Sequence, residues 1–172
     1  MKRFLILSMF IMTIPTLLTA CTNLIVTKGA SADSATYLVY LNDGEWLYHL
    51  DRTPAKDHDV SDSLTYTSMT GKPYKIHQVA HTNAIIGFLM NEYQLAIGES
   101  TFVGREELWD KSAPLKYWEL MRLALLRAKT AREAIEVITT LVETYGYGSE
   151  GESISIADPN EAWLLEIIGT GG

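Results

Sequence analysis

The chain carries at residues 18–29 the stretch Leu18-Thr19-Ala20-Cys21-Thr22-Asn23-Leu24-Ile25-Val26-Thr27-Lys28-Gly29. It joins an apolar segment that ends at Ala20 to a run rich in β-branched residues that begins directly after Cys21. Such a run favours a β-strand. Cys21 is the only cysteine of the chain. If the chain were cut before Cys21, this one residue would carry both a thiol nucleophile and a free α-amine.

The first 20 residues have the organisation of a secretory signal peptide. Lys2 and Arg3 form a positive start, residues 4–18 are almost wholly apolar, and Ala20 is a small residue at the expected cut. The apolar run is shorter than the roughly 20 residues of a membrane span. We therefore expect residues 1–20 to be removed and residues 21–172 to form one domain, secreted or periplasmic. The alternative is an uncleaved anchor.

Composition narrows the class of protein. The 172 residues are 47% hydrophobic and 20% charged, which is enough apolar material for the core of one globular domain. A net charge of −7 without a basic stripe argues against nucleic-acid binding, because phosphates need a positive face. A single cysteine excludes a disulfide within the chain.

The histidine spacings indicate no metal site and no cofactor. His77 and His81 are four residues apart but lack a metal-binding motif and a third ligand, and Asp57-His58-Asp59 lies in a polar segment. Solvated loops are the expected setting for them. A papain-like pairing of Cys21 with a histidine stays open in principle, although the sequence around Cys21 does not support it.

The strand beginning after Cys21 is expected to form a hairpin. Residues 22–27 and 35–41 are β-rich runs separated by a small polar turn. Their pairing would return Asn42 and Asp43 towards Cys21. Further along, two more hairpins are expected at residues 84–98 and 153–168. The polar segment at residues 51–73 is expected to be a long surface loop.

Two helices are expected between the second and third hairpins. Apolar residues recur at helical spacing over residues 117–128 and again over residues 134–145. Thr130 and Glu133 form a capping box before the second stripe, and Gly146 is placed to end that helix. Strands followed by helices and strands again indicate an α+β fold with a largely antiparallel sheet.

Three interpretations of Cys21 remain open. A buried cysteine would act as a small hydrophobe. Leu18-Thr19-Ala20-Cys21 also has the form of a bacterial lipoprotein box, and a lipid would block both thiol and amine. The third interpretation is a nucleophile. A lipoprotein needs a flexible tether, whereas here the strand begins at once, which favours the nucleophile.

An N-terminal cysteine needs no histidine as base. Its α-amine has an ordinary pKa of about 7.7–8.0, so the amine can accept the thiol proton near neutral pH. Asp43 is either a carboxylate that holds this amine or an ordinary turn residue before Gly44. Glu99, at the polar end of residues 95–98, is either at the edge of the site or on the surface.

Four stretches, in chain order through most of residues 21–172, resemble one known family: Cys21 to Asp33, Asn91 to Thr101, Arg127 to Ala134, and Gly151 to Trp163. They are similar to the dipeptidase A family of cysteine N-terminal-nucleophile hydrolases, which are related to penicillin V acylase and bile salt hydrolase.

The resemblance implies an αββα sandwich and hydrolysis of small peptides, namely dipeptides with a free N-terminus. It implies that Cys21 is nucleophile and base, and that Asp43 is the carboxylate of the family motif. The stretch containing Asn91 and Glu99 matches the substrate or oxyanion region. The resemblance implies no cofactor, and the sequence does not indicate an oligomeric state.

The chain departs from the family pattern in several places. Ser34 stands where the family turn has glycine, and Tyr40-Leu41-Asn42 stands where many relatives carry an arginine. Family members are also longer, so we expect an incomplete, N-terminal part of the domain. A lipid-anchored surface protein and an inactive remnant of the enzyme are the alternative functions.

Overall fold

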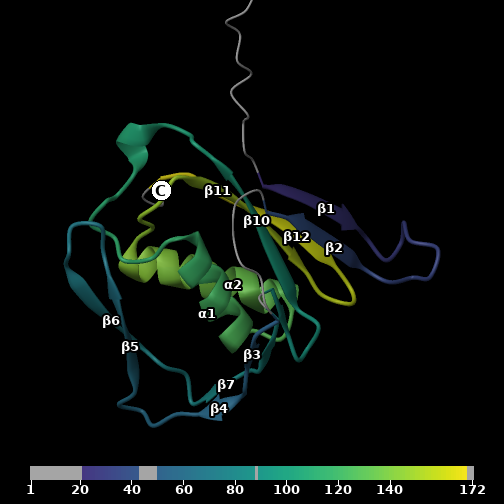
Figure 1. Ribbon diagram of the computed structural model, residues 1–172, viewed down its shortest axis with the longest axis horizontal. Coiled ribbons are helices and arrows are strands. Elements are labelled where there is room, and N and C mark those ends of the chain that lie inside the picture. The colour runs from purple at the N-terminus through teal and green to yellow at the C-terminus, as the bar shows by residue number, and fades with distance from the viewer. Residues whose placement is uncertain (1–20, 43–49, 88, 170–172) are drawn as a thin grey trace, which may run out of the picture.

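The computed structural model describes residues 21–42, 50–87 and 89–169. This part of the chain combines antiparallel strands with two α-helices (Figure 1), in agreement with the predicted mixed architecture. The expected signal peptide and Asp43 lie outside the described residues. None of the helices in the described ranges is long and apolar enough to cross a membrane.

The hairpin after Cys21 is confirmed. β1 (Thr22–Val26) and β2 (Tyr37–Leu41) pair antiparallel, with Thr22 opposite Leu41. Ser34, which follows Asp33 in the turn between these strands, adopts a φ of 59°. This left-handed conformation costs a non-glycine residue about 1–2 kcal/mol. The Asp33 carboxylate supports the turn by accepting hydrogen bonds from the Ala35 N–H and the Tyr37 hydroxyl.

A six-stranded antiparallel sheet forms the centre of the fold, in the order β12-β11-β10-β9-β8-β3. Its long members are β10 (Ala96–Phe102), β11 (Gly151–Ala157) and β12 (Ala162–Ile167). The short ones are β9 (Met90–Asn91), β8 (Ile85–Ile86) and β3 (Arg52–Thr53). The β11–β12 hairpin was predicted. The hairpin expected over residues 84–98 is wrong in its first strand, expected at residues 84–90, because Gly87 turns with a φ of 68° between β8 and β9.

The long loop expected at residues 51–73 is also wrong. Besides β3, this region and its continuation contain β4 (Lys56–Asp57), β5 (Ser63–Thr67), β6 (Pro73–His77) and β7 (His81–Thr82). β5 pairs with β6, and β4 pairs with β7. Leu64 and Tyr66 pack against the core, and Ile76 is buried in it. Alternation of these few apolar side chains with polar ones is the pattern of a half-exposed strand.

The two predicted helices are confirmed as α1 (Tyr117–Arg127) and α2 (Ala131–Tyr145). The Thr130 hydroxyl accepts a hydrogen bond from the Glu133 N–H at 3.3 Å, as the capping box requires. The Glu133 carboxylate accepts a hydrogen bond from the Lys129 N–H, whereas a full capping box would use the Thr130 N–H. Gly146 ends α2 with a φ of 83°. A short 3₁₀ helix, η1 (Glu106–Leu108), precedes α1.

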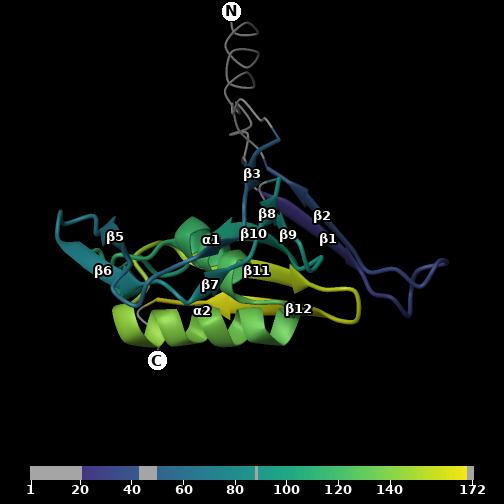
Figure 2. The same cartoon turned by 90° about the horizontal axis from the view of Figure 1, so that it is seen from below.

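The elements are arranged in layers (Figure 2). α2 lies along β11 and β12, α1 packs against β10, and the β1–β2 hairpin lies over β10 and β11. Apolar side chains from the helices and the sheet form one core between them. Its largest fully buried members are Tyr147, Ile76, Ile85, Leu95, Ile97, Leu115, Leu120, Leu123, Leu125, Ile138, Ile154 and Ile156.

Two buried polar residues join these elements. Asn91 donates to the carbonyls of Leu125 and Ala128 at 2.9 and 2.7 Å. These carbonyl groups at the end of α1 would otherwise lack a helical partner. Asp158, between β11 and β12, accepts at 2.8 Å from the N–H of Ala131, the first residue of α2. Its other oxygen accepts from the N–H groups of its own turn.

Candidate active site

Cys21 lies at the start of β1, against the central sheet. The Ser100 hydroxyl of β10 donates to the Cys21 carbonyl at 2.8 Å, which fixes the main chain there. Gly98 lets the hairpin come this close. A Cβ at Gly98 would lie 2.6 Å from Asn23 Oδ1, 3.2 Å from Leu38 Cδ2 and 3.3 Å from the Tyr40 Cβ. The nucleophile candidate is therefore positioned by a close contact between two sheets.

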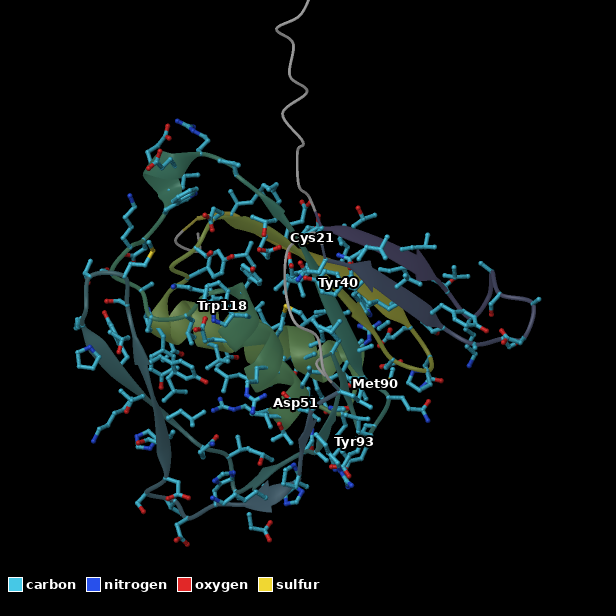
Figure 3. All side chains as sticks on the ribbon, viewed as in Figure 1. Cys21, Tyr40, Asp51, Met90, Tyr93 and Trp118 are labelled. Atoms are coloured by element: carbon cyan, nitrogen blue, oxygen red, sulfur yellow. The ribbon has the colours of Figure 1, made fainter. Side chains whose placement is uncertain are left out.

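The Tyr40 hydroxyl lies 3.7 Å from the Cys21 Sγ, within the distance of a hydrogen bond to sulfur. The same hydroxyl donates to Glu99 Oε1, and it accepts from Asn42 Nδ2 at 3.1 Å. Figure 3 shows Cys21 and Tyr40 beside one another where the hairpin crosses β10. Tyr40 thus connects the thiol to a carboxyl group of the central sheet.

The Tyr40 hydroxyl reaches Glu99 around the edge of β10. Side chains alternate along a strand, so Gly98 and Ser100 face the hairpin, whereas Ile97 and Glu99 face the helices. Beyond Ala96, β10 has a described strand partner only on its β11 side. The Tyr40 side chain passes this open edge to reach Glu99. The site therefore draws residues from both faces of the sheet.

A second carboxyl group, Glu152 of β11, lies beside Glu99. Thr101, directly opposite Glu152 in the strand register, donates to Glu152 at 3.0 Å and approaches Glu99 at 3.4 Å. Glu152 has no exposed surface, and Glu99 is 2% exposed. Burial and a neighbouring like charge each disfavour the ionised form of a carboxyl group. Burial, followed by hydrogen bonding to Glu99 and its charge, raises the pKa of Glu152 to about 9.

This raised pKa predicts that the protein loses stability as pH rises. Glu152 titrates at about 4.5 when unfolded and at about 9 when folded, so its favourable contribution is complete below the first value and is lost through the second. We expect the free energy of unfolding in urea to fall between about pH 5 and about pH 9, and Glu152→Gln to flatten that fall. The exposed Glu166→Gln on β12 should keep the wild-type slope. Parallel curves for wild type and Glu152→Gln would contradict the prediction.

A pocket of about 390 Å³ adjoins Cys21. It lies between the hairpin and the sheet, and hydroxyl and apolar side chains share its wall. The lining residues are Cys21, Thr22, Asn23, Ile25, Ser100, Ser153, Ser155 and Leu164. A concave site with a few polar groups is the usual form of a small-molecule site. Here the nucleophile candidate is part of its wall.

The structure brings together only some of the predicted site residues. Glu99 lies in the Cys21 network. Asn91 does not: its amide oxygen accepts from the N–H groups of Tyr93 and Leu95, and its amide nitrogen holds the end of α1. Asp43 is outside the described residues. Among the described residues, no cluster of three acidic, histidine or cysteine side chains could hold a metal.

Two residues of the network, Tyr40 and Glu152, were not among the predicted site residues. Tyr40 had been noted only as a departure from the family pattern. Glu152 stands in the stretch Gly148-Ser149-Glu150-Gly151-Glu152, which has the composition of an exposed turn. The register of β10 with β11 brings it beside Glu99, and that register cannot be derived from local composition.

The thiol of Cys21 lies beside a tyrosine at the wall of a pocket, which makes it a candidate nucleophile. The family model described as Peptidase family C69 matches residues 20–172, and the chain therefore belongs to this family, the dipeptidase A family of cysteine peptidases. The resemblance stated from the sequence is thereby confirmed. Membership of a peptidase family implies peptide substrates.

Proposed function

We propose that the protein is a secreted or periplasmic dipeptidase that acts through an acyl-enzyme on Cys21. The observation that carries the proposal is the placement of Cys21, whose carbonyl is held by Ser100 and whose thiol contacts Tyr40 at the wall of a pocket of about 390 Å³. Membership of Peptidase family C69 supplies the peptide substrate. A pocket of this volume lies within the usual size range of small-molecule sites, which is compatible with a dipeptide.

The proposed reaction begins after residues 1–20 have been removed. The free α-amine of Cys21 takes the thiol proton, and the thiolate attacks the carbonyl carbon of the peptide bond. Fixed N–H donors hold the resulting oxyanion, for which the backbone near Glu99 is the proposed source. The C–N bond then breaks, and the ammonium group returns the proton to the leaving amine. Water attacks the thioester, which releases the acid and restores the thiol.

Asp43 is proposed to hold the α-amine in position for these transfers. Asn42, the residue before it, donates to the Tyr40 hydroxyl, and β2 ends opposite Thr22. The proposed fold of the whole domain is the αββα sandwich of N-terminal-nucleophile hydrolases. A helix layer, a central sheet and a second sheet formed by the β1–β2 hairpin support it.

Two measurements on the exported protein test the proposal. When residues 1–172 are expressed for export, the intact mass of the product should equal that of residues 21–172 with an unmodified N-terminal cysteine, and the product should release free amino acids from dipeptides. An N-acetylated dipeptide serves as the control and should resist cleavage, because the proposed substrate has a free amine. A lipid-bearing Cys21 would overturn the proposal in favour of a surface lipoprotein. A free Cys21 without hydrolysis would identify an inactive remnant.

A further inference from the structure

The face of β11 that meets the β1–β2 hairpin is polar, although it lies between two packed sheets. β11 contains the run Ser153-Ile154-Ser155-Ile156, and side chains alternate along a strand. Ile154 and Ile156 are fully buried in the core that the sheet shares with the helices, so Ser153 and Ser155 face the hairpin. Sheets that pack face to face usually fill the space between them with interdigitating apolar side chains. Two small hydroxyl side chains leave part of this space open.

The neighbouring strands extend this polar face into the floor of the pocket beside Cys21. Ser153 lies opposite Ser100 of β10, whose hydroxyl holds the Cys21 carbonyl at 2.8 Å. On the other side of β11, Ser155 lies opposite Leu164 of β12. All of these residues line the pocket of about 390 Å³, and residues of β1 line it from the hairpin side. The pocket therefore extends from Cys21 across three strands of the central sheet.

Several polar groups of this pocket have no hydrogen-bond partner in the described part of the chain. The Ser153 and Ser155 hydroxyls make no hydrogen bond there, although Ser155 is only 2% exposed. The side-chain amide of Asn23, which lines the pocket from β1, makes none either, and its Oδ1 is buried. Buried polar groups in proteins are nearly always hydrogen-bonded. A ligand that brings hydrogen-bonding groups into the pocket would supply the missing partners.

The wall of the pocket also limits the charge of such a ligand. Among the described residues, no aspartate, glutamate, lysine, arginine or histidine lines it. Glu166, opposite Ser153 in the register, is exposed and is not part of the wall. A charged group would lose water in the pocket and find no opposite charge there. Hydroxyl and amide groups both donate and accept hydrogen bonds, so the wall suits an uncharged polar group.

The position of the pocket relative to Cys21 indicates which half of a dipeptide enters it. Its lining residues from β1 are Thr22, Asn23 and Ile25, which follow Cys21 along the chain. The α-amine that returns the proton to the leaving amine is at the opposite end of Cys21. The leaving residue must lie near that amine. The acyl half, which is the N-terminal residue of the dipeptide, then lies on the side of the pocket.

We propose that the pocket floored by Ser153 and Ser155 is a specificity subsite for an uncharged polar side chain, such as that of threonine or asparagine, on the N-terminal residue of the dipeptide. This inference rests on the proposed dipeptidase function of the same site. Ser153, Ser155 and Asn23 form hydrogen bonds with the substrate side chain, and Leu164 contacts its aliphatic part. An apolar side chain of the same shape leaves the three polar residues unpaired. An acidic one brings a charge that no residue of the wall neutralises.

Matched pairs of dipeptides test this preference through kcat/KM. Thr-Ala and Val-Ala have nearly the same shape and differ in one hydroxyl group, whereas Asn-Ala and Asp-Ala differ in charge. We expect kcat/KM for Thr-Ala to exceed that for Val-Ala by about three- to tenfold, which is the effect of one ordinary hydrogen bond. Asn-Ala should exceed Asp-Ala by at least about threefold. Ala-Thr and Ala-Val carry the same side chains on the leaving residue and should differ by less than about twofold.

Variants of the two serines test whether the preference comes from this pocket. Ser155→Ala, alone and combined with Ser153→Ala, removes hydroxyl groups and adds no atom that could clash. The ratio of Thr-Ala to Val-Ala should fall in the single variant and approach about one in the double variant. Ser61→Ala is the matched control, because Ser61 is exposed in the turn before β5, at the other end of the molecule from β1 (Figure 1). It should keep the wild-type ratio, which does not depend on the amount of active enzyme.

A binding measurement separates the subsite from the dipeptidase proposal. Calorimetric titration of Cys21→Ser with Thr-Ala and Val-Ala reports on the pocket without hydrolysis, and Kd should favour Thr-Ala by about three- to tenfold. This preference in binding, found without hydrolysis by the wild type, would reject the dipeptidase and keep the subsite. Three results would reject the subsite alone: hydrolysis of Thr-Ala and Val-Ala at equal kcat/KM, a preference that persists in the double serine variant, or the same preference in the Ala-Thr and Ala-Val pair.

Discussion

Replacing Cys21 with serine is expected to reduce dipeptide hydrolysis by at least about 1,000-fold. The thiolate is the attacking species in the proposed reaction, and a serine hydroxyl is a much weaker acid and a poorer nucleophile than a thiol in a site built around sulfur. Initial rates of amino-acid release, measured for wild type and variant at matched concentration, check the prediction. The change should appear in kcat, because the small sulfur-to-oxygen replacement leaves the pocket wall nearly intact.

The same replacement should leave the fold almost unaltered. Cys21 is only half-buried, and the hydrogen bond from Ser100 goes to its main-chain carbonyl, which every variant keeps. Urea denaturation of Cys21→Ser should therefore stay within about 1 kcal/mol of wild type. Thr27→Ser, exposed beyond the far end of β1, is the matched control and should retain full activity. Substantial hydrolysis by Cys21→Ser would contradict the assignment of the nucleophile.

Gly98→Ala is expected to damage both stability and activity. The added Cβ would lie 2.6 Å from Asn23 Oδ1, closer than real Cβ atoms approach, and would also press on Leu38 and Tyr40. Overpacking of this kind typically costs about 1–3 kcal/mol. Because these residues form the inner face of the hairpin, the displacement should move Tyr40 and Cys21. An error of about 1 Å in a reacting group can reduce a rate roughly 100-fold.

Thermal unfolding and dipeptide hydrolysis would both be measured for this variant. Gly29→Ala provides the comparison, since no atom lies within 4 Å of a Cβ built there. Its stability and activity should match those of wild type. Equal behaviour of the two variants would show that Asn23 simply turns aside and that the close approach at Gly98 is not needed for the site.

Local sequence patterns were sufficient to predict much of the fold. The β-branched run after Cys21, the two helical stripes and the cap at Thr130 each depend on neighbours within a few residues. The failures have a different cause. β3, β4 and β7 are two residues long, and each pairs with a strand at least 24 residues away. Their few residues carry too little periodicity to distinguish a strand from a polar loop.

Some residues of the candidate site could likewise be proposed from local sequence, and others could not. Cys21 could be proposed as a nucleophile because its position relative to the expected cut is a local property, and its role stays a prediction. Glu99 was identified only as a residue at a strand end. Its connection to Tyr40 depends on how the hairpin crosses β10, and its connection to Glu152 depends on the register of β10 with β11. Neither arrangement follows from composition, because only the folded chain brings these strands together.

Asp158 has a consequence for the order in which the chain can acquire structure. One oxygen of its carboxylate organises the turn between β11 and β12, and the other accepts from the first amide of α2, 27 residues earlier in the chain. Releasing the turn would leave that amide, buried at the helix start, without its acceptor. The end of the sheet and the beginning of α2 should therefore open and close as one cooperative unit, so this helix is not a separately folding segment laid on a finished sheet.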